Sequence, residues 1–234
     1  MRKQYLTGLV IFVLFPFSPI IPFAESNNSI LVFGGTGRIG SEIVKVLESQ
    51  GNKISIFVRP SSDRKRLEGL NISYLIGNVL SEKDVARAFE NQKFDAVISS
   101  LAKVGQEPNP HAIGGRNLTK WAKKNGVKHF ILISSLGAGP EPVFTKYKEI
   151  LQAKGEAETA LTSSGIDYTI IRTGIILYEE EPATGNAKLI HNQNVIGTIT
   201  RKDLAQLTAA CVFDHQCINQ VYNAVDCSLN CQVQ

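Results

Sequence analysis

The chain has 234 residues, with 25 lysines and arginines against 21 aspartates and glutamates. Its 43% hydrophobic and 20% charged residues are ordinary globular values, which exclude a disordered, collagenous or repeat protein. A net charge of +4 is too small to indicate a nucleic-acid or anionic-membrane partner.

The first 26 residues differ from the rest of the chain. Arg2 and Lys3 precede an apolar stretch that three prolines interrupt. Its unbroken part is too short to span a bilayer, and prolines break helices. The pattern is typical of a secretory signal peptide over 1–26, with an uncleaved membrane anchor as the alternative. We therefore expect an exported protein, periplasmic or secreted, whose mature domain spans 27–234 and has no stable membrane insertion after cleavage.

From residue 29 onward, strand and helix patterns alternate. Short apolar runs are typical of buried parallel strands, and apolar residues three and four apart are typical of one helix face. The predicted strands are 29–33, 53–58, 72–76, 95–99, 129–133, 168–171 and 220–225. The predicted helices are 39–49, one opening at Ser81, 109–125, 145–164 and 201–213. The alternation predicts an α/β fold, a Rossmann-like doubly wound parallel sheet with helices on both faces in a single domain.

Residues 174–198 follow neither periodicity and include Pro182, Gly185 and Gly197. Ligands of open α/β sheets bind at the carboxyl ends of the strands. We expect this segment to be irregular and to cover the substrate pocket at that edge.

A glycine-rich loop joins the first predicted strand to the first predicted helix. A pyrophosphate must approach the backbone closely, which glycine permits, and the N–H groups at a helix start carry partial positive charge. Because the G-x-x-G-x-x-G frame lies between a strand and an amphipathic helix, it predicts a dinucleotide site. We assign to this site Gly34, Thr36, Gly37, Arg38, Ile39 and Gly40.

Two arginines indicate which dinucleotide is bound. Arg59 follows the second strand, where an acid would bind the adenosine ribose of NAD and a cation accommodates a 2′-phosphate instead. Arg38 lies in the glycine loop, near the same region. Because guanidinium forks match phosphate geometry, the pair favours NADP, and NAD is the less favoured cofactor.

Five stretches carry a resemblance to a known family. They are 34–40 (GGTGRIG), 58–60 (VRP), 77–79 (GNV), 131–137 (ILISSLG) and 164–174 (SGIDYTIIRTG). Through them the chain resembles the short-chain dehydrogenase/reductase superfamily, in its atypical NAD(P)H-binding branch. That branch includes the nitrogen-metabolite-repressor-like and the flavin/biliverdin reductase proteins.

The resemblance implies that the ends of four further strands line the cofactor. The implied residues are Asn78, Val79, Ser99, Ser100, Leu101, Ser134 and Thr173. Asn78 stands where the family usually has an aspartate at the adenine, and its side-chain oxygen remains an acceptor. Ser134 would lie beside the reacting carbonyl, and Thr173 near the nicotinamide.

The catalytic pair of the superfamily, a tyrosine with a lysine four residues later, is incomplete here. Counting from Ser134 gives Tyr147, but Leu151 then stands at the lysine position. Counting back from the helix end gives Lys154, but Ile150 then stands at the tyrosine position. The catalytic candidates are Ser134, Tyr147 and Lys154, with Lys154 also a ribose ligand. A surface tyrosine and a solvated lysine are the alternatives. His111 is a weaker acid/base candidate, for which a surface position is favoured.

Four cysteines lie near the C-terminal end, at Cys211, Cys217, Cys227 and Cys231. Their spacings match no zinc knuckle, so we predict no metal site. In an oxidising compartment they can form two disulfides, in any of three pairings.

Together, these features predict an NAD(P)H-dependent oxidoreductase that transfers hydride to a small or planar molecule. Because the tyrosine–lysine pair is incomplete, a non-catalytic NADP(H)-binding sensor or assembly factor is the alternative. An NAD-dependent epimerase-like protein is a third reading, for which the chain is short.

Overall fold

The computed structural model describes residues 27–90, 92–102, 108–142, 144–177 and 181–233. Its strands are β1 Ser29–Phe33, β2 Lys53–Val58, β3 Ile72–Ile76, β4 Ala96–Ser99, β5 His129–Ser135, β6 Asp167–Thr173, β7 Ile175–Ile176, β8 Lys188–Ile190, β9 Val195–Ile199 and β10 Gln220–Val233. Its helices are α1 Arg38–Ser49, α2 Glu82–Glu90, α3 Pro110–Lys124, α4 Lys148–Thr162 and α5 Arg201–Ala210, with short 3-10 turns η1 Lys65–Leu67 and η2 Thr145–Tyr147. The signal peptide or anchor predicted for 1–26 lies outside the described residues and stays a prediction.

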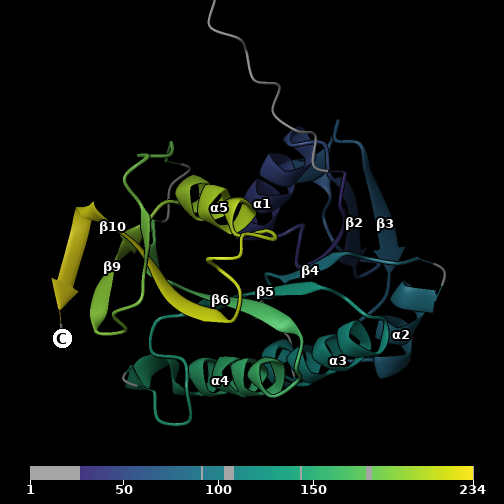
Figure 1. The fold of residues 1–234 in the computed structure, drawn as a ribbon. Coiled ribbons are helices and arrows are strands. Elements are labelled where there is room, and N and C mark those ends of the chain that lie inside the picture. Colours follow the sequence, from purple (N-terminus) through teal and green to yellow (C-terminus); the bar gives the residue numbers. More distant parts are fainter. Residues whose placement is uncertain (1–26, 91, 103–107, 143, 178–180, 234) are drawn as a thin grey trace, which may run out of the picture.

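The strands form one sheet in the order β3-β2-β1-β4-β5-β6-β10-β9-β7, and β8 also pairs with β10 (Figure 1). From β3 through β10 the neighbours are parallel, which confirms the predicted doubly wound arrangement. Helices α1 and α5 cover one face of the sheet, and α2, α3 and α4 cover the other (Figure 1). None of the helices in the described ranges is both long and apolar enough to cross a bilayer.

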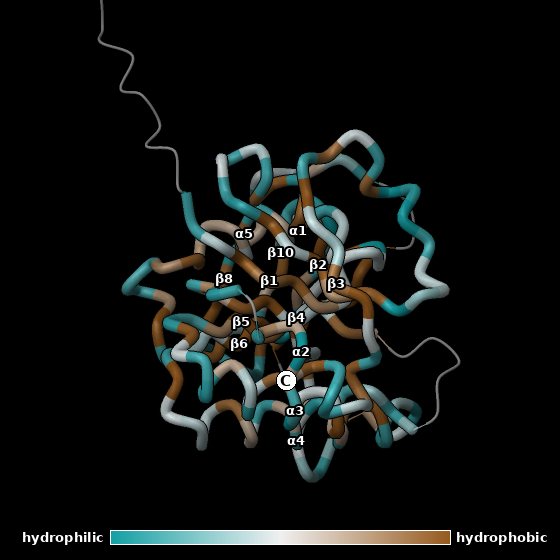
Figure 2. The backbone as a smooth tube through the Cα atoms, turned by 90° about the vertical axis from the view of Figure 1, so that its right-hand side faces the viewer, coloured by the Kyte–Doolittle hydropathy of each residue, from teal (hydrophilic) through white to brown (hydrophobic). Residues whose placement is uncertain are grey.

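Alternation along the strands divides the interior into two cores. In β1, Ile30 and Val32 pack under α1 and α5, whereas Leu31 and Phe33 pack under the other three helices. All four side chains are fully buried, and burial of each contributes about 1.5–3 kcal/mol to folding. The central strands are accordingly brown in the hydropathy colouring, while the outer loops carry most of the teal (Figure 2).

The prediction that residues 174–198 are irregular is wrong. This region contains β7, β8 and β9, and the last two pair antiparallel with β10. The partner strand is also longer than predicted, since β10 continues from Gln220 to Val233. The physical reason is that such short strands satisfy their backbone through a distant partner, which leaves no local periodicity.

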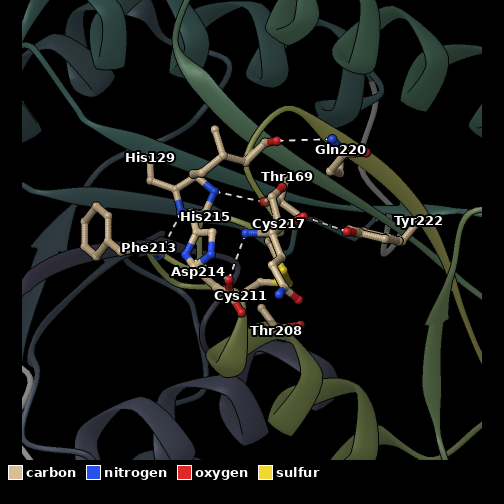
Figure 3. The surroundings of a disulfide bond; sticks show 12 residues. His129, Thr169, Thr208, Cys211, Phe213, Asp214, His215, Cys217, Gln220 and Tyr222 are labelled. Carbon is tan, nitrogen blue, oxygen red and sulfur yellow. Dashed lines mark hydrogen bonds and ion pairs between the residues drawn. A yellow bond between two sulfur atoms is a disulfide. The ribbon is translucent and has the colours of Figure 1, made fainter.

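All four cysteines are paired, Cys211 with Cys217 and Cys227 with Cys231. The first bond ties the end of α5 to the turn that leads into β10 (Figure 3). Helix α5 therefore ends at Ala210, three residues before the predicted end. Disulfides persist in oxidising compartments, and the expected export of the chain stays a prediction.

Candidate functional site

The glycine loop follows the carboxyl end of β1 and closes tightly on itself. Gly34 has a φ of +76°, and its carbonyl accepts the Gly37 N–H at 3.0 Å. A Cβ on Gly34 would lie 2.2 Å from the Ser100 carbonyl oxygen, and one on Gly40 would lie 2.2 Å from the Gly34 oxygen. Both positions therefore require glycine.

Helix α1 begins directly after this loop. Its N-cap Gly37 supplies no side-chain cap, and its first turn holds no acidic residue. The first N–H groups of the helix thus have no capping side chain, and the helix dipole adds positive potential at the same place. Arg38 is exposed there, and Ile39 packs partly against the core. These features fit the pyrophosphate of a dinucleotide.

A groove lies beside the loop, between the ends of β1, β2, β3 and β4. It is lined by Gly34, Thr36, Gly37, Phe57, Val58, Arg59, Ser62, Gly77, Val79, Ser100, Leu101, Ala102 and Pro110. Seven of the predicted cofactor residues meet here, namely Gly34, Thr36, Gly37, Arg59, Val79, Ser100 and Leu101. The groove lies in the place expected for the adenosine half of a dinucleotide.

The turn after β2 contributes polar groups to the groove. Arg59 is exposed, and its backbone N–H donates to the Ser62 hydroxyl at 3.2 Å. Both residues line the groove. Ser62 was not singled out from the sequence, since a lone serine after a strand carries no signal.

Asn78 lies between two lining residues and has local partners. Its side-chain oxygen accepts the Leu80 N–H at 3.0 Å, and its own N–H donates to an Asp84 carboxylate oxygen at 3.0 Å. The adjacent Gly77 and Val79 face the groove. The asparagine thus shapes the turn after β3, with one lone pair of its oxygen already engaged.

A second, inner cavity lies deeper, between the carboxyl halves of β4 and β5 and the helices α3 and α4. It is lined by Ser99, Leu101, His111, Gly115, Leu132, Ile133, Ser134, Lys154 and Ala157. Leu101 belongs to both cavities. Ser134 is 1% exposed, and its hydroxyl has no hydrogen-bond partner among the described residues. Thr173 is buried and lies opposite Ser135 in the β5–β6 register.

Lys154 enters the inner cavity from α4. Its Nζ donates to the Ile133 carbonyl oxygen at 3.4 Å. Burial disfavours the charged ammonium and lowers the pKa of Lys154 to about 8, an effect that the negative charge of Glu158 opposes. The structure therefore brings Lys154 and Ser134 to one cavity. The predicted roles, a lysine at the ribose and a serine beside the reacting carbonyl, require this proximity.

Tyr147 lies apart from this group. The helix predicted to start at 145 begins at Lys148, and Tyr147 belongs to the preceding 3-10 turn. Its N–H donates to the Phe144 carbonyl in that tighter turn, and the side chain is 54% exposed. Tyr147 lines neither of the two cavities described above.

His111 is buried, contrary to the favoured surface position. It is 6% exposed and lines the inner cavity. The reason lies in the next turn of α3, where a Cβ on Gly115 would come within 2.6 Å of the Ala157 Cβ. Because α3 packs closely against α4 here, His111 in the first turn of α3 is buried. The adjacent glycines 114 and 115 are the sequence signal for it.

Comparison with known proteins agrees with this geometry. The NAD(P)H-binding family model matches residues 34–215. The chain is 34% identical over 170 residues to Protein FMP52, mitochondrial, of Candida albicans, covering 67% of this chain and 71% of that protein. It is 27% identical over 239 residues to the sanguinarine reductase of Eschscholzia californica, covering 81% of this chain and 85% of the relative.

Two further comparisons bear on activity and fold. The NAD(P)H azoreductase of Xenophilus azovorans is 28% identical over 149 residues, which are 63% of this chain and 48% of that enzyme, so the chain matches about half of its length. The solved structure of ChuY, an anaerobillin reductase from Escherichia coli O157:H7, superposes with a TM-score of 0.76 at 24% identity, covering 86% of this chain and 98% of that one. The match to ChuY shows the fold. Because the family model spans the glycine loop and every residue that lines the two cavities, the chain belongs to the NAD(P)H-binding family.

Proposed function

We propose that the protein is an oxidoreductase that uses NADPH to reduce a small planar molecule. The observation that carries the proposal is the groove beside the glycine loop, about 130 Å³, which shares Leu101 with the small inner cavity of about 10 Å³. The outer groove has the glycine loop and Arg59, and the inner one has Ser134 and Lys154. Two of the relatives compared above are reductases by name, which supports hydride transfer as the reaction class.

The residues divide the work between binding and orientation. When bound, NADPH supplies the hydride. The glycine loop and the start of α1 bind the pyrophosphate, and Arg59 binds the 2′-phosphate. Lys154 would orient the nicotinamide ribose, and the buried Ser134 hydroxyl would donate to the reacting group of the substrate. A planar acceptor needs little acid catalysis, so proximity supplies most of the rate.

Turnover distinguishes an enzyme from a sensor. We expect the protein to oxidise NADPH with at least one of a panel of azo dyes, quinones, flavins and carbonyls. The loss of NADPH absorbance measures this oxidation. Lys154→Ala should weaken NADPH binding about tenfold, because the hydrogen bond from Lys154 to the ribose is lost. The turnover rate of Tyr147→Phe should stay within about twofold of the wild-type rate, since the Tyr147 ring lies outside both cavities.

Two outcomes would contradict this picture. Tight NADPH binding without turnover on any acceptor would favour the sensor. A large loss in Tyr147→Phe would instead make that hydroxyl the proton donor.

Cofactor choice is tested at the groove. Arg59→Ala should weaken NADPH binding by about 1–3 kcal/mol and leave NADH binding nearly unchanged, because only NADPH carries the 2′-phosphate. Isothermal titration calorimetry measures both. Arg66→Ala is the matched control, since Arg66 is exposed in the same turn region and does not line the groove. An equal loss for both cofactors would refute the 2′-phosphate role.

A further inference from the structure

A buried ion pair lies one helical turn from Lys154. Glu158 is 6% exposed, and Arg172 of β6 binds both of its carboxylate oxygens. The Arg172 Nε donates to Oε1 at 3.1 Å, and Nη2 donates to Oε2 at 2.6 Å. Such a two-pronged contact fixes the carboxylate in position as well as in charge.

The guanidinium is itself held from a second side. Arg172 Nη1 donates to the Gln193 side-chain oxygen at 3.1 Å. Gln193 lies in the turn between β8 and β9, and its amide nitrogen donates to the carbonyls of His191 and Val221. The guanidinium therefore cannot rotate away from Glu158 without breaking this contact as well.

Lys154 and Glu158 are four residues apart on α4, a spacing at which a lysine and a glutamate usually approach each other. Here both oxygens of the carboxylate are bound to Arg172, and the Lys154 Nζ donates to the Ile133 carbonyl instead. Three charged or titratable groups thus surround Lys154, namely His111 across the inner cavity, Glu158 on its own helix, and Arg172 behind Glu158. The carboxylate pairs with Arg172 and acts on Lys154 through its charge alone.

We propose that Glu158 and Arg172 are positioning residues for Lys154: Arg172 holds the carboxylate out of a close ion pair with the lysine and so makes its ammonium easier to deprotonate. The inference rests on the proposed function, in which Lys154 meets the nicotinamide ribose. The balance of these charges then decides whether Lys154 meets the ribose hydroxyls as a cation or as a neutral amine.

The two partners act on the lysine with opposite signs. Without Arg172, the Glu158 carboxylate is released toward Lys154 and favours the ammonium, which raises its pKa. Without the charge of Glu158, the attraction that favours the Lys154 ammonium is lost, which lowers the pKa of Lys154 further. If the pair had only a structural role, both variants would be destabilised and the pKa of Lys154 would not shift in opposite directions.

The titration of Lys154 tests this directly. The full chain is labelled with lysine carrying carbon-13 at Cε, and the Lys154 resonance is assigned by its absence in Lys154→Met. We expect Arg172→Gln to raise the titration midpoint by about one pH unit and Glu158→Gln to lower it by about one. The control is Glu156→Gln on the same helix, whose partner Arg116 lies 2.7 Å away and where both side chains are more than half exposed, so the midpoint should not move.

Shifts in the same direction in both variants, or an equal shift in the control, would overturn the proposal. If Arg172→Gln does not fold, Arg172→Lys replaces it: the amine keeps the charge but cannot hold both oxygens, so a smaller upward shift is expected, and no shift would count against the proposal. Because the titration uses protein without cofactor, the expected shifts combined with no NADPH binding would reject the proposed function alone.

Discussion

Gly34→Ala is expected to lower the free energy of unfolding by about 3 kcal/mol and to weaken NADPH binding tenfold or more, about 1.4 kcal/mol. Two costs add at this position. The backbone has a φ of +76°, which disfavours any side chain. The new Cβ would also lie 2.2 Å from the Ser100 carbonyl oxygen, a backbone atom that cannot move without shifting β4. Because the same loop binds the pyrophosphate, any relief of the clash deforms the cofactor site.

Gly69→Ala separates the two costs. Gly69 has a φ of +81°, and a Cβ there would meet no atom within 4 Å. The free energy of unfolding of Gly69→Ala should fall by only about 1 kcal/mol, and its NADPH binding should be unchanged. Urea denaturation measures the stability of both variants, and calorimetry measures binding. Equal losses of stability would show that the approach of Ser100 to Gly34 contributes nothing.

The parallel sheet could be predicted because each of its strands carries its own local signal. In β1, buried residues alternate between two cores. The apolar run ends in glycines, which indicate a tight turn directly after the strand. The position of the groove could also be predicted, because the carboxyl ends of neighbouring parallel strands meet at one edge of the sheet. Ser134 and Lys154 were placed by resemblance, and the structure brings them to one cavity.

What could not be predicted depends on contacts between distant segments. Strand β8 pairs with β10, and β9 pairs with β10 on one side and β7 on the other, so neither forms from local contacts. The spacing of the cysteines left three pairings open. The choice of Cys211 with Cys217 follows from the end of α5, after which Phe213 takes a positive φ of 60° and turns the chain back. The pairing of Glu158 with Arg172 likewise joins a helix to a strand, and neither residue carries a local signal for it.

A buried histidine at the amino edge of the sheet makes stability depend on acid. His129 is fully buried beside the Cys211–Cys217 bond (Figure 3). Its Nδ1 accepts the Phe213 N–H at 3.1 Å, so the proton resides on Nε2, which lies 2.9 Å from the Thr169 hydroxyl. That hydroxyl donates in turn to the Cys217 carbonyl at 2.7 Å. Protonation of Nδ1 would break the first of these bonds and place a charge in the core.

Acidification should therefore destabilise the protein through His129. Burial lowers the pKa of His129 from 6.5 to about 4, with the charge of Asp167 opposing the shift. Above pH 6.5 the histidine is neutral in both states and the stability is fully present. As the pH falls from 6.5 toward 4, the unfolded chain takes up a proton that the folded chain refuses, and about 3 kcal/mol is lost.

His129→Asn isolates this contribution, because its side-chain oxygen can still accept the Phe213 N–H but does not titrate. The variant should be less stable at pH 7, and its unfolding free energy, measured in urea at intervals from pH 7 to pH 4, should fall by about 3 kcal/mol less than that of the wild type. Parallel pH profiles for the two proteins would mean that His129 is protonated as easily in the folded state as in the unfolded chain. The hydrogen-bond chain from Phe213 through Thr169 to Cys217 would then not hold the neutral ring.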